Sequence, residues 1–319
     1  MCQRALIAVV CSVIVLAIAL RKQKRSAVLP SRNERVIILG ASTTDGIGAS
    51  IAAESLKRGV RSIILVGRSA DGLRNVHKQL IATFPAECRA TTVIQFPADC
   101  TRDADVLAVR DRAVSEFGGV DTLYVVFGSI VTKTLLGVAG ADPVQGDDTP
   151  TNLSPAELSH VHSAMEEACT INVTGTALVL VAFIPVLQTS SRAPHVGVIG
   201  SLAALIPAPT RALYCAVKAA QQQLVLGAAA ECETQAQIPG RSLVKFTVLA
   251  PGTVATSFRS RDPHARALSP TVVAHHAIDC INKGSTGVVP LPSKYFIAWL
   301  LSILLPKLVE RGAHAKYGY

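Results

Sequence analysis

The sequence predicts an α/β protein with a single Rossmann-type, doubly wound parallel sheet of about seven strands and helices on both faces. From residue 35 onward, short runs of Val, Ile and Leu alternate with longer stretches of helical spacing. Hydrophobic residues make up 50% of the chain but aromatic ones only 4%, so the core is aliphatic, as in buried parallel strands. A length of 319 residues suits one undivided domain of this class.

The apolar runs and the stretches between them place the elements. Strands are predicted at Val36–Leu39, Ser62–Val66, Thr92–Phe96, Thr122–Phe127, Val196–Gly200, Leu243–Leu249 and Gly287–Leu291. Helices are predicted at Gly46–Arg58, Asp71–Thr83, Asp103–Phe117, Met165–Leu187 and Tyr214–Cys232. A polar, Gly- and Pro-rich stretch from Gly137 to Pro155 is predicted to be a surface loop. These elements define one domain, residues 32–292.

An apolar run without charges, Ala5 to Leu20, predicts an N-terminal membrane helix within residues 1–25. As a helix it reaches about 24 Å, a little short of a hydrocarbon core of about 30 Å. A thinner membrane, such as that of the endoplasmic reticulum, accommodates this length. A cleaved signal peptide is the alternative, because Ala17-Ile18-Ala19 has the small-x-small form of a cleavage site.

Basic residues crowd the stretch after this run and contribute to a net charge of +9. They are Arg21, Lys22, Lys24, Arg25, Arg32 and Arg35. Such a flank more often meets anionic lipid headgroups than nucleic acid, and no stripe of basic and aromatic residues supports nucleic-acid binding. The positive-inside rule places the folded domain on the cytoplasmic side of the membrane. Glycosylation of the sequon Asn152-Leu153-Ser154 would indicate the lumenal side instead.

A second apolar run, Tyr295 to Leu305, lies within residues 293–319 and is too short to span a membrane. It carries Trp299 and Tyr295, side chains suited to the membrane interface. We expect an interfacial helix here. A helix packed on the protein's own core, or on the partner in a homodimer, is the alternative.

The first strand runs directly into a glycine-containing turn from Gly40 to Gly48, and a helix follows. Glycines at this place permit a tight turn and a close approach of a pyrophosphate to a helix N-terminus. Gly40, Ser42, Gly46, Ile47 and Gly48 are therefore the predicted phosphate-binding residues.

The end of the second strand indicates which dinucleotide binds. Enzymes that use NAD place an acid there for the ribose hydroxyls, whereas enzymes that use NADP offer an arginine to the 2′-phosphate. This chain has Arg68, and the nearest acid, Asp71, begins the next helix. Arg68 therefore favours NADP(H) over NAD(H), with a solvated surface arginine as the alternative.

A candidate proton donor lies on the helix predicted after the fifth strand. Tyr214 and Lys218 are four residues apart, hence on one helix face. A tyrosine pKa near 10 is too high for efficient proton transfer at neutral pH, and a neighbouring cation lowers it. Ser201, at the end of the fifth strand, can reach the same pocket across the sheet edge.

These features occur in the order found in short-chain dehydrogenases/reductases, and the chain resembles that family over residues 32–292. The matching landmarks are the glycine turn, Asp99, Asn172, Ser201, Tyr214 with Lys218, and Pro251–Thr256. The resemblance implies that Tyr214 is the general acid or base, that Lys218 lowers its pKa and holds the nicotinamide ribose, and that Ser201 binds the substrate oxygen. It also implies that Asn172 supports a water-linked proton relay to Lys218. Further cofactor contacts implied are Asp99 to the adenine, and Pro251, Gly252, Val254 and Thr256 beside the nicotinamide.

Two departures from the family pattern stand out. The glycine turn is two residues longer than usual. The Asn-Asn-Ala-Gly segment after the fourth strand is replaced by Val125-Val126-Phe127-Gly128, whose side chains cannot make the hydrogen bonds of the asparagines. Cofactor fit or activity could suffer from this replacement.

The sequence thus predicts an NADP(H)-dependent oxidoreductase that interconverts a ketone and a secondary alcohol. Attachment to a membrane of the endoplasmic reticulum, or to a lipid droplet, favours a lipophilic substrate such as a steroid, retinoid, long-chain acyl or sphingoid compound. The chain resembles the membrane-bound branch of the family that includes hydroxysteroid dehydrogenases and the dehydrogenase/reductase family member 7 group. No metal site is expected. The alternative function is a non-catalytic NADP-binding scaffold at a membrane or lipid droplet.

Overall fold

The computed structural model describes residues 24–146, 152–257 and 267–317. The predicted membrane helix from Ala5 to Leu20 therefore lies outside the described residues, as do Arg21 and Lys22. Within the described residues, one continuous helical stretch, Pro155–Ser190, is long and apolar enough to cross a membrane by length and composition. The second half of this stretch, Gly175–Ser190, packs on the sheet as a core helix, because Val179, Leu180 and Phe183 are buried in the main hydrophobic core.

A seven-stranded sheet in which every pair is parallel forms the centre of the molecule, in the order β3-β2-β1-β4-β5-β6-β7. The strands are β1 (Arg35–Leu39), β2 (Ser62–Gly67), β3 (Thr92–Pro97), β4 (Thr122–Val125), β5 (His195–Ile199), β6 (Lys245–Pro251) and β7 (Gly287–Leu291). The order reverses between β1 and β4, which makes that point the topological switch of a doubly wound sheet. The predicted fold class is confirmed.

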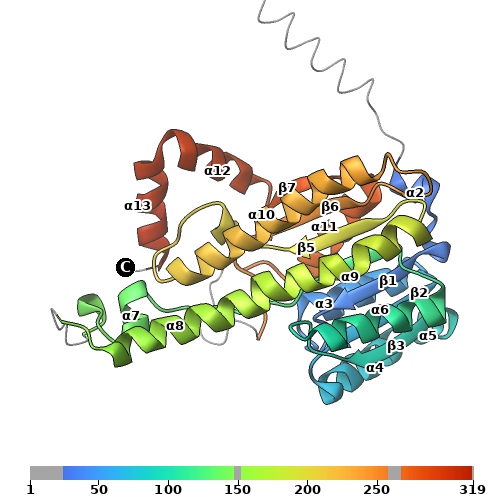
Figure 1. Ribbon diagram of the computed structural model, residues 1–319, viewed down its shortest axis with the longest axis horizontal. Coiled ribbons are helices and arrows are strands. Elements are labelled where there is room, and N and C mark those ends of the chain that lie inside the picture. Colours follow the sequence, from blue (N-terminus) through green and yellow to red (C-terminus); the bar gives the residue numbers. More distant parts are fainter. Residues whose placement is uncertain (1–23, 147–151, 258–266, 318–319) are drawn as a thin grey trace, which may run out of the picture.

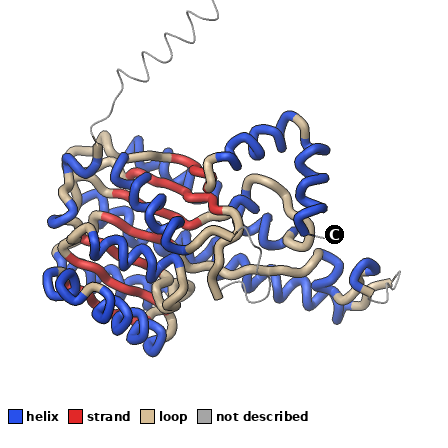
Figure 2. The backbone as a smooth tube through the Cα atoms, turned by 180° about the vertical axis from the view of Figure 1, so that it is seen from behind, coloured by secondary structure: helices blue, strands red, loops and turns tan. Residues whose placement is uncertain are grey.

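Helices cover both faces of this sheet, as Figures 1 and 2 show. One face carries α3 (Ile47–Lys57), α4 (Ala70–Thr83) and α11 (Pro270–Lys283). The other carries α6 (Asp103–Phe117), α9 (Gly175–Ser190) and α10 (Ala212–Gln235). Alternate residues of β1 serve the two cores: Ile37 and Leu39 pack with α6 and α9, whereas Val36 and Ile38 pack with α3 and α11.

The long helix ahead of β5 begins ten residues earlier than predicted. It consists of α8 (Pro155–Cys169), a π-helical turn η3 (Thr170–Thr174) and α9. Ser154 caps its start in a capping box with Glu157. Pi turns are often found at functional sites, because the extra residue redirects side chains. Here the turn contains Asn172.

Several short elements were not predicted, and the stretch from Gly137 to Pro155 is not a loop throughout. Val138, Ala139 and Asp142 are buried there, because a short helix and a 3-10 turn fold back on α8. The additional elements are α2 (Arg25–Val28), η1 (Ser31–Asn33), α5 (Pro85–Ala90), α7 (Leu135–Ala139), η2 (Pro143–Gln145) and η4 (Leu202–Ala204).

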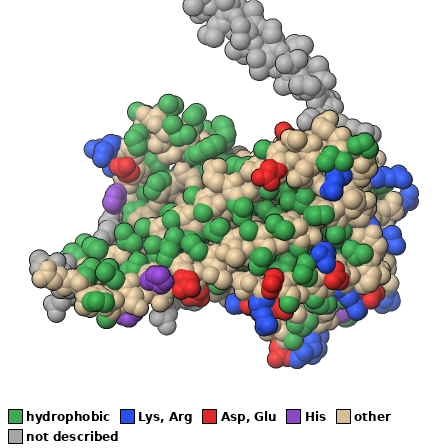
Figure 3. Space-filling model, in the orientation of Figure 1, with side chains coloured by type: hydrophobic (Ala, Val, Ile, Leu, Met, Phe, Trp, Pro, Cys, Tyr) green, Lys and Arg blue, Asp and Glu red, His purple; other side chains and the backbone are tan. Residues whose placement is uncertain are grey.

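The chain continues after β7 into two helices, α12 (Lys294–Leu304) and α13 (Pro306–Tyr317). They pack on each other and stand beyond the strand ends, at the upper left of Figure 1. Their surface is unusually apolar, and hydrophobic side chains gather over it in Figure 3. The exposed members of this apolar C-terminal surface are Phe296, Ile297, Leu300, Ile303, Leu304, Leu305 and Leu308.

Two of the basic residues expected at lipid headgroups are instead part of the fold. Arg25 is only 4% exposed and pairs with the buried carboxylate of Glu34 at 2.7 Å. Arg35 pairs with Asp121, also at 2.7 Å. The prediction was wrong for these two side chains because tertiary contacts hold them: Arg25 also donates to the carbonyl oxygen of Ala193, and Arg35 to that of Ser190. Arg32 is exposed.

Replacing Arg25 by methionine should lower the free energy of unfolding by about 3 to 5 kcal/mol, because the substitution leaves Glu34 buried with only Arg58 as a charged partner. Urea titration of the variant and the unchanged chain measures the difference. Arg32→Met is the matched control and should stay within about 0.5 kcal/mol. Equal losses in both variants would show that the Arg25–Glu34 pair contributes no more to the free energy of unfolding than an exposed arginine does.

Candidate active site

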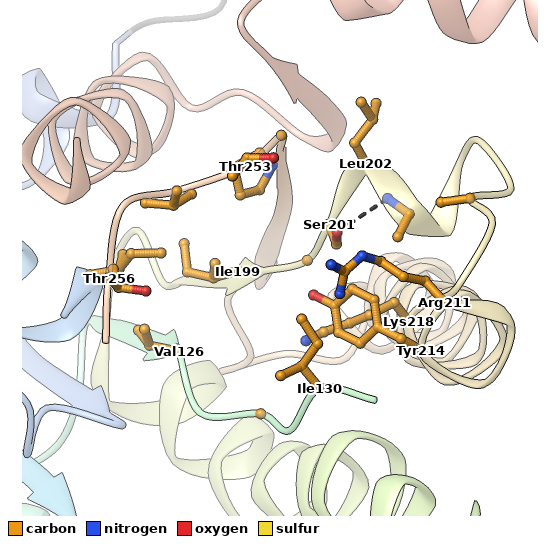
Figure 4. A pocket seen from close by; sticks show the side chains of 18 of the residues that line it. Val126, Ile130, Ile199, Ser201, Leu202, Arg211, Tyr214, Lys218, Thr253 and Thr256 are labelled. Atoms are coloured by element: carbon orange, nitrogen blue, oxygen red, sulfur yellow. Dashed lines mark hydrogen bonds between the residues drawn. The ribbon is translucent and has the colours of Figure 1, made fainter. Parts of the chain in front are cut away.

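A cavity of about 850 Å³ lies beyond the carboxyl ends of the strands. It begins at the glycine turn after β1, passes the ends of β4, β5 and β6, and reaches α10 and the two C-terminal helices. Figure 4 shows its catalytic end, with Tyr214, Lys218 and Arg211 directed from α10 toward the side where Ser201 lies. In an open α/β sheet, ligands bind at this edge and at the switch point.

The glycine turn fits a dinucleotide. Gly40 has a φ of +99°, and a Cβ there would lie 2.6 Å from the backbone nitrogen of Phe127. A Cβ on Gly48 would lie 2.3 Å from the carbonyl oxygen of Gly40. Gly46 is the N-cap of α3, and no side chain caps that helix end. The first N–H groups of α3 are thus left for an anion such as a pyrophosphate.

Arg68, Asp99 and Thr101 line the opposite end of the cavity from α10. The carboxylate of Asp99 accepts hydrogen bonds from the backbone nitrogen and the hydroxyl of Thr101, at 2.9 and 2.8 Å. Burial raises the pKa of Asp99, but these hydrogen bonds and the charge of Arg68 outweigh it and keep the pKa below its usual value. The exposed guanidinium of Arg68 is free to reach a ligand phosphate there.

Tyr214 is buried at the first turn of α10, beside Ser201. Burial raises the pKa of its phenol, and a hydrogen bond with Ser201 and the charge of Arg211 oppose that rise. Ser201 is held in place because its hydroxyl also accepts from the backbone nitrogen of Ala203 at 3.1 Å. At neutral pH the phenol therefore carries its proton and can donate it.

Lys218 is fully enclosed, and burial lowers its pKa to about 8. Its Nζ donates to Oε1 of Gln221 at 2.9 Å, and Gln221 in turn donates to the hydroxyl of Thr176 at 2.8 Å. We expected Lys218 to be the cation that lowers the pKa of Tyr214. That expectation stays a prediction: the Nζ of Lys218 faces Gln221, and Arg211 is a further cation whose charge acts on Tyr214.

Asn172 lies behind the cavity rather than on its wall. Its Nδ2 donates to the carbonyl oxygen of Ala168 at 2.9 Å and to the hydroxyl of Ser129 at 3.0 Å. Gly128 separates it from Lys218, because a Cβ there would meet Oδ1 of Asn172 at 2.9 Å and Nζ of Lys218 at 3.2 Å. The side chain therefore anchors the segment after β4. The water-linked relay to Lys218 that the family resemblance implies would have to pass through that narrow gap.

The unusual Val126-Phe127 segment is held to the end of β1 by backbone hydrogen bonds. Both backbone nitrogens donate to the carbonyl oxygen of Leu39, at 2.8 and 3.1 Å. This turn ends β4 at Val125, two residues before the predicted end. The Phe127 ring packs against Gly175 of α9, where any Cβ would lie 3.1 Å from the ring. Hydrophobic packing thus replaces the hydrogen bonds that asparagines would make.

The cavity brings together most of the predicted site residues. Gly48 and Asn172 are the exceptions, since both lie behind its wall. Those that line it are Gly40, Ser42, Gly46, Ile47, Arg68, Asp99, Ser201, Tyr214, Lys218, Pro251, Gly252, Val254 and Thr256.

Sequence reasoning missed Arg211 and the whole of α13. Arg211 precedes Tyr214 by three residues, so helical spacing alone could have placed it beside the phenol. No local signal could have placed α13 here, because its contact with the cavity spans about a hundred residues of chain. Val309, Ala313 and Tyr317 line the cavity from this helix.

Comparisons with known proteins agree with this geometry. The family model described as short chain dehydrogenase matches residues 34–267. A curated relative, 2-(S)-hydroxypropyl-CoM dehydrogenase 3 of Xanthobacter autotrophicus, is 27% identical over 243 residues, which is 76% of this chain and 80% of that protein.

Solved structures share the fold. A short chain dehydrogenase/reductase from Burkholderia phymatum in complex with NAD superposes with a TM-score of 0.66 at 19% identity, covering 86% of this chain and 94% of that one. The alcohol dehydrogenase of the archaeon Thermococcus sibiricus, complexed with 5-hydroxy-NADP, gives a TM-score of 0.60 at 23% identity, with 82% and 97% covered. Neighbours of this fold thus bind either NAD or NADP derivatives.

The buried ammonium of Lys218 should make stability depend on pH in one direction. Its pKa is about 8 in the folded chain and 10.5 in the unfolded one, so the unfolded chain binds more protons between these values. The free energy of unfolding of the unchanged protein, minus that of Lys218→Met, should therefore rise by about 3 kcal/mol from pH 7.5 to 10.5.

Urea titrations at a series of pH values measure this difference. Lys78→Met, at an exposed position of α4, is the control and should give a nearly constant difference. Parallel curves for Lys218→Met would show that the ammonium is not held in a water-poor site.

Proposed function

This chain belongs to the short-chain dehydrogenase family, and from that premise we propose that it is an NADP(H)-dependent oxidoreductase that interconverts a ketone and a secondary alcohol on a lipophilic substrate. The observation that carries the proposal is the position of the Tyr214 phenol, which lies beside Ser201 at the far end of the cavity that starts at the glycine turn. The candidate proton donor and the predicted cofactor-binding turn therefore line one cavity.

The side chains present support proton transfer to a carbonyl oxygen. In reduction, the Ser201 hydroxyl donates a hydrogen bond to the substrate oxygen and Tyr214 delivers its proton to that atom. In oxidation, the phenolate of Tyr214, which the charge of Arg211 stabilises, removes the proton from the alcohol and becomes the neutral phenol. Lys218, Gln221 and Thr176 form a hydrogen-bonded chain behind the phenol. A bound nicotinamide dinucleotide supplies or accepts the hydride.

Arg68 supports the choice of NADP(H). It is a cation directly after β2, where a 2′-phosphate would lie. Among the described residues, no acidic side chain lies in the short turn between β2 and α4. Asp99 is nearby, but its carboxylate is occupied by Thr101. An electropositive end of this kind prefers the additional phosphate.

The apolar walls near α10 support a lipophilic substrate. Ile130, Leu202 and Ile206 line the cavity there, together with Leu301 and Leu308 of the C-terminal helices. A steroid, retinoid, long-chain acyl or sphingoid body would lose little hydrophobic free energy on moving from lipid to such a wall. Membership in the branch of hydroxysteroid dehydrogenases and the family member 7 group is proposed on the same ground.

The apolar C-terminal surface supports attachment to a membrane of the endoplasmic reticulum or a lipid droplet. Its exposed apolar side chains lie on the same two helices that line the cavity, and Lys294, Lys307 and Arg311 are exposed along these helices. An apolar face bordered by cations is typical of helices that lie in a lipid interface. With the N-terminal run, this surface would bring the mouth of the cavity to the bilayer from the cytoplasmic side.

A non-catalytic NADP-binding scaffold is the second candidate. The replaced asparagines before Gly128 favour it, because Val126 and Phe127 offer no polar side chain to an adenosine. The backbone hydrogen bonds that hold this segment to Leu39 favour an enzyme. So does the presence of Ser201, Tyr214 and Lys218 together on the cavity wall.

Tyr214→Phe should reduce NADPH-dependent ketone reduction by at least about 10²-fold, because the proton donor is lost while the ring remains. In the unchanged enzyme the rate of reduction should be level from pH 6 to 9. The rate of alcohol oxidation should rise with pH, since the pKa of Tyr214 is raised. Absorbance at 340 nm with a panel of lipid ketones and alcohols gives both profiles. Equal turnover by Tyr214→Phe would contradict the mechanism, and NADPH binding without turnover across the panel would favour the scaffold.

Arg68→Asp should lower kcat/KM for NADPH by about 10²-fold and leave that for NADH within a few-fold, because a carboxylate repels the 2′-phosphate and suits the ribose hydroxyls. Steady-state kinetics with both cofactors measures the ratio. Arg74→Asp, on the exposed side of α4, is the control. A ratio that does not change would show that Arg68 is a solvated surface residue.

Trp299 is the only tryptophan of the chain, and it lies on α12. Its fluorescence in full-length protein bound to vesicles should be quenched by lipids with brominated acyl chains. The double change of Ile297→Glu and Ile303→Glu should remove most of this quenching by preventing insertion of the helix face. Val114→Glu with Leu107→Glu, exposed on α6, is the matched control. An unquenched Trp299 would contradict this attachment, and glycosylation at Asn152 would contradict the cytoplasmic side.

A further inference from the structure

One charged side chain of the cavity wall, Arg211, has no salt-bridge partner among the described residues. Arg211 is only 8% exposed, and its Nη1 atom is buried without a hydrogen-bond partner. Among the described residues its guanidinium forms no salt bridge, and its Cζ lies 5.3 Å from the centre of the Tyr317 ring. Burying a guanidinium without an anion costs several kcal/mol, so folds seldom retain such a group without use.

The guanidinium lies at the place of reaction. Figure 4 shows it beside the hydroxyls of Tyr214 and Ser201, the two groups that would hold a reacting oxygen. All three side chains line the same cavity. A group bound by Arg211 would therefore be separated from the reacting carbon by only one or two bonds.

The surroundings of Arg211 favour an anion. Lys316 also lines the cavity, with its Nζ 5.3 Å from the centre of the same Tyr317 ring. Arg211 is the N-cap of α10, and no side chain caps that end, so the positive end of the helix dipole adds to the charge. In the part of the chain that the structure describes, no carboxylate forms a salt bridge with Arg211.

We propose that Arg211 binds a carboxylate of the substrate next to the reacting carbonyl, which makes the substrate a 2-oxo or 3-oxo acid, or the matching hydroxy acid, with an apolar body. The planar guanidinium matches a carboxylate with two parallel hydrogen bonds. The apolar body lies against Ile206, Leu301 and Leu308. This assignment rests on the proposed oxidoreductase function and narrows its substrate class.

The test compares 2-oxodecanoate with 2-oxodecanamide, which differ only in the charge of the group beside the carbonyl. With NADPH and the full-length enzyme, kcat/KM for the acid should exceed that for the amide by about 10²-fold. Arg211→Met should remove this preference, chiefly by raising KM for the acid. Arg211→Lys should keep part of it, because an ammonium retains the charge but not the fork. Arg112→Met, at an exposed position of α6, is the control and should keep the full preference.

The ratio isolates carboxylate binding from a second effect of Arg211. Its charge also acts on the phenol of Tyr214, but that effect changes the rates for acid and amide alike. Equal use of acid and amide by the unchanged enzyme, or an equal loss for both in Arg211→Met, would overturn the proposal.

A binding measurement separates this proposal from the proposed function. Decanoate should quench the fluorescence of NADPH bound to the unchanged protein, decanol should do so much more weakly, and Arg211→Met should lose the decanoate response. If neither ketone is reduced but this pattern appears, the oxidoreductase function fails and the anion site stands. If ketones are reduced but decanoate binds no better than decanol, the anion site falls and the function stands.

Discussion

The site depends on the close approach of two backbone segments at the carboxyl ends of β1 and β4. The carbonyl oxygen of Leu39 accepts hydrogen bonds from the nitrogens of Val126 and Phe127, and Gly40 passes so near that a Cβ would lie 2.6 Å from Phe127. This contact closes the switch point of the sheet and leaves the cavity open above it. Because backbone groups make it, the contact tolerates valine and phenylalanine where other family members have polar side chains.

The parts that the sequence predicts well are those governed by local patterns. Buried parallel strands are continuous apolar runs, and all seven predicted strands lie within two residues of the observed ends at both termini. The glycine turn and the Tyr214–Lys218 spacing are equally local, because each follows from one tight turn or one helix face. Such patterns survive without knowledge of what packs against them.

The parts that escape prediction depend on contacts between distant residues. Arg25 resembles a lipid-facing cation in the sequence, but its partner Glu34 is fixed by the start of the sheet. Lys218 shares a helix face with Tyr214, but its hydrogen bond to Gln221 could not be predicted from that spacing. The helix α13 carries no motif at all, and only the folded chain brings Tyr317 beside Arg211. In each case a side chain has several partners that the spacing allows, and tertiary packing selects one.

The long glycine turn has a further effect on the cavity walls. Asp45 accepts hydrogen bonds from the backbone nitrogen and the hydroxyl of Ser257, at 2.8 and 2.9 Å, and so connects that turn to the segment after β6. The two segments belong to opposite walls of the dinucleotide groove. Because every turnover converts one bound dinucleotide, the dinucleotide must be exchanged before the next substrate reacts, so this contact between the two segments bears on each catalytic cycle.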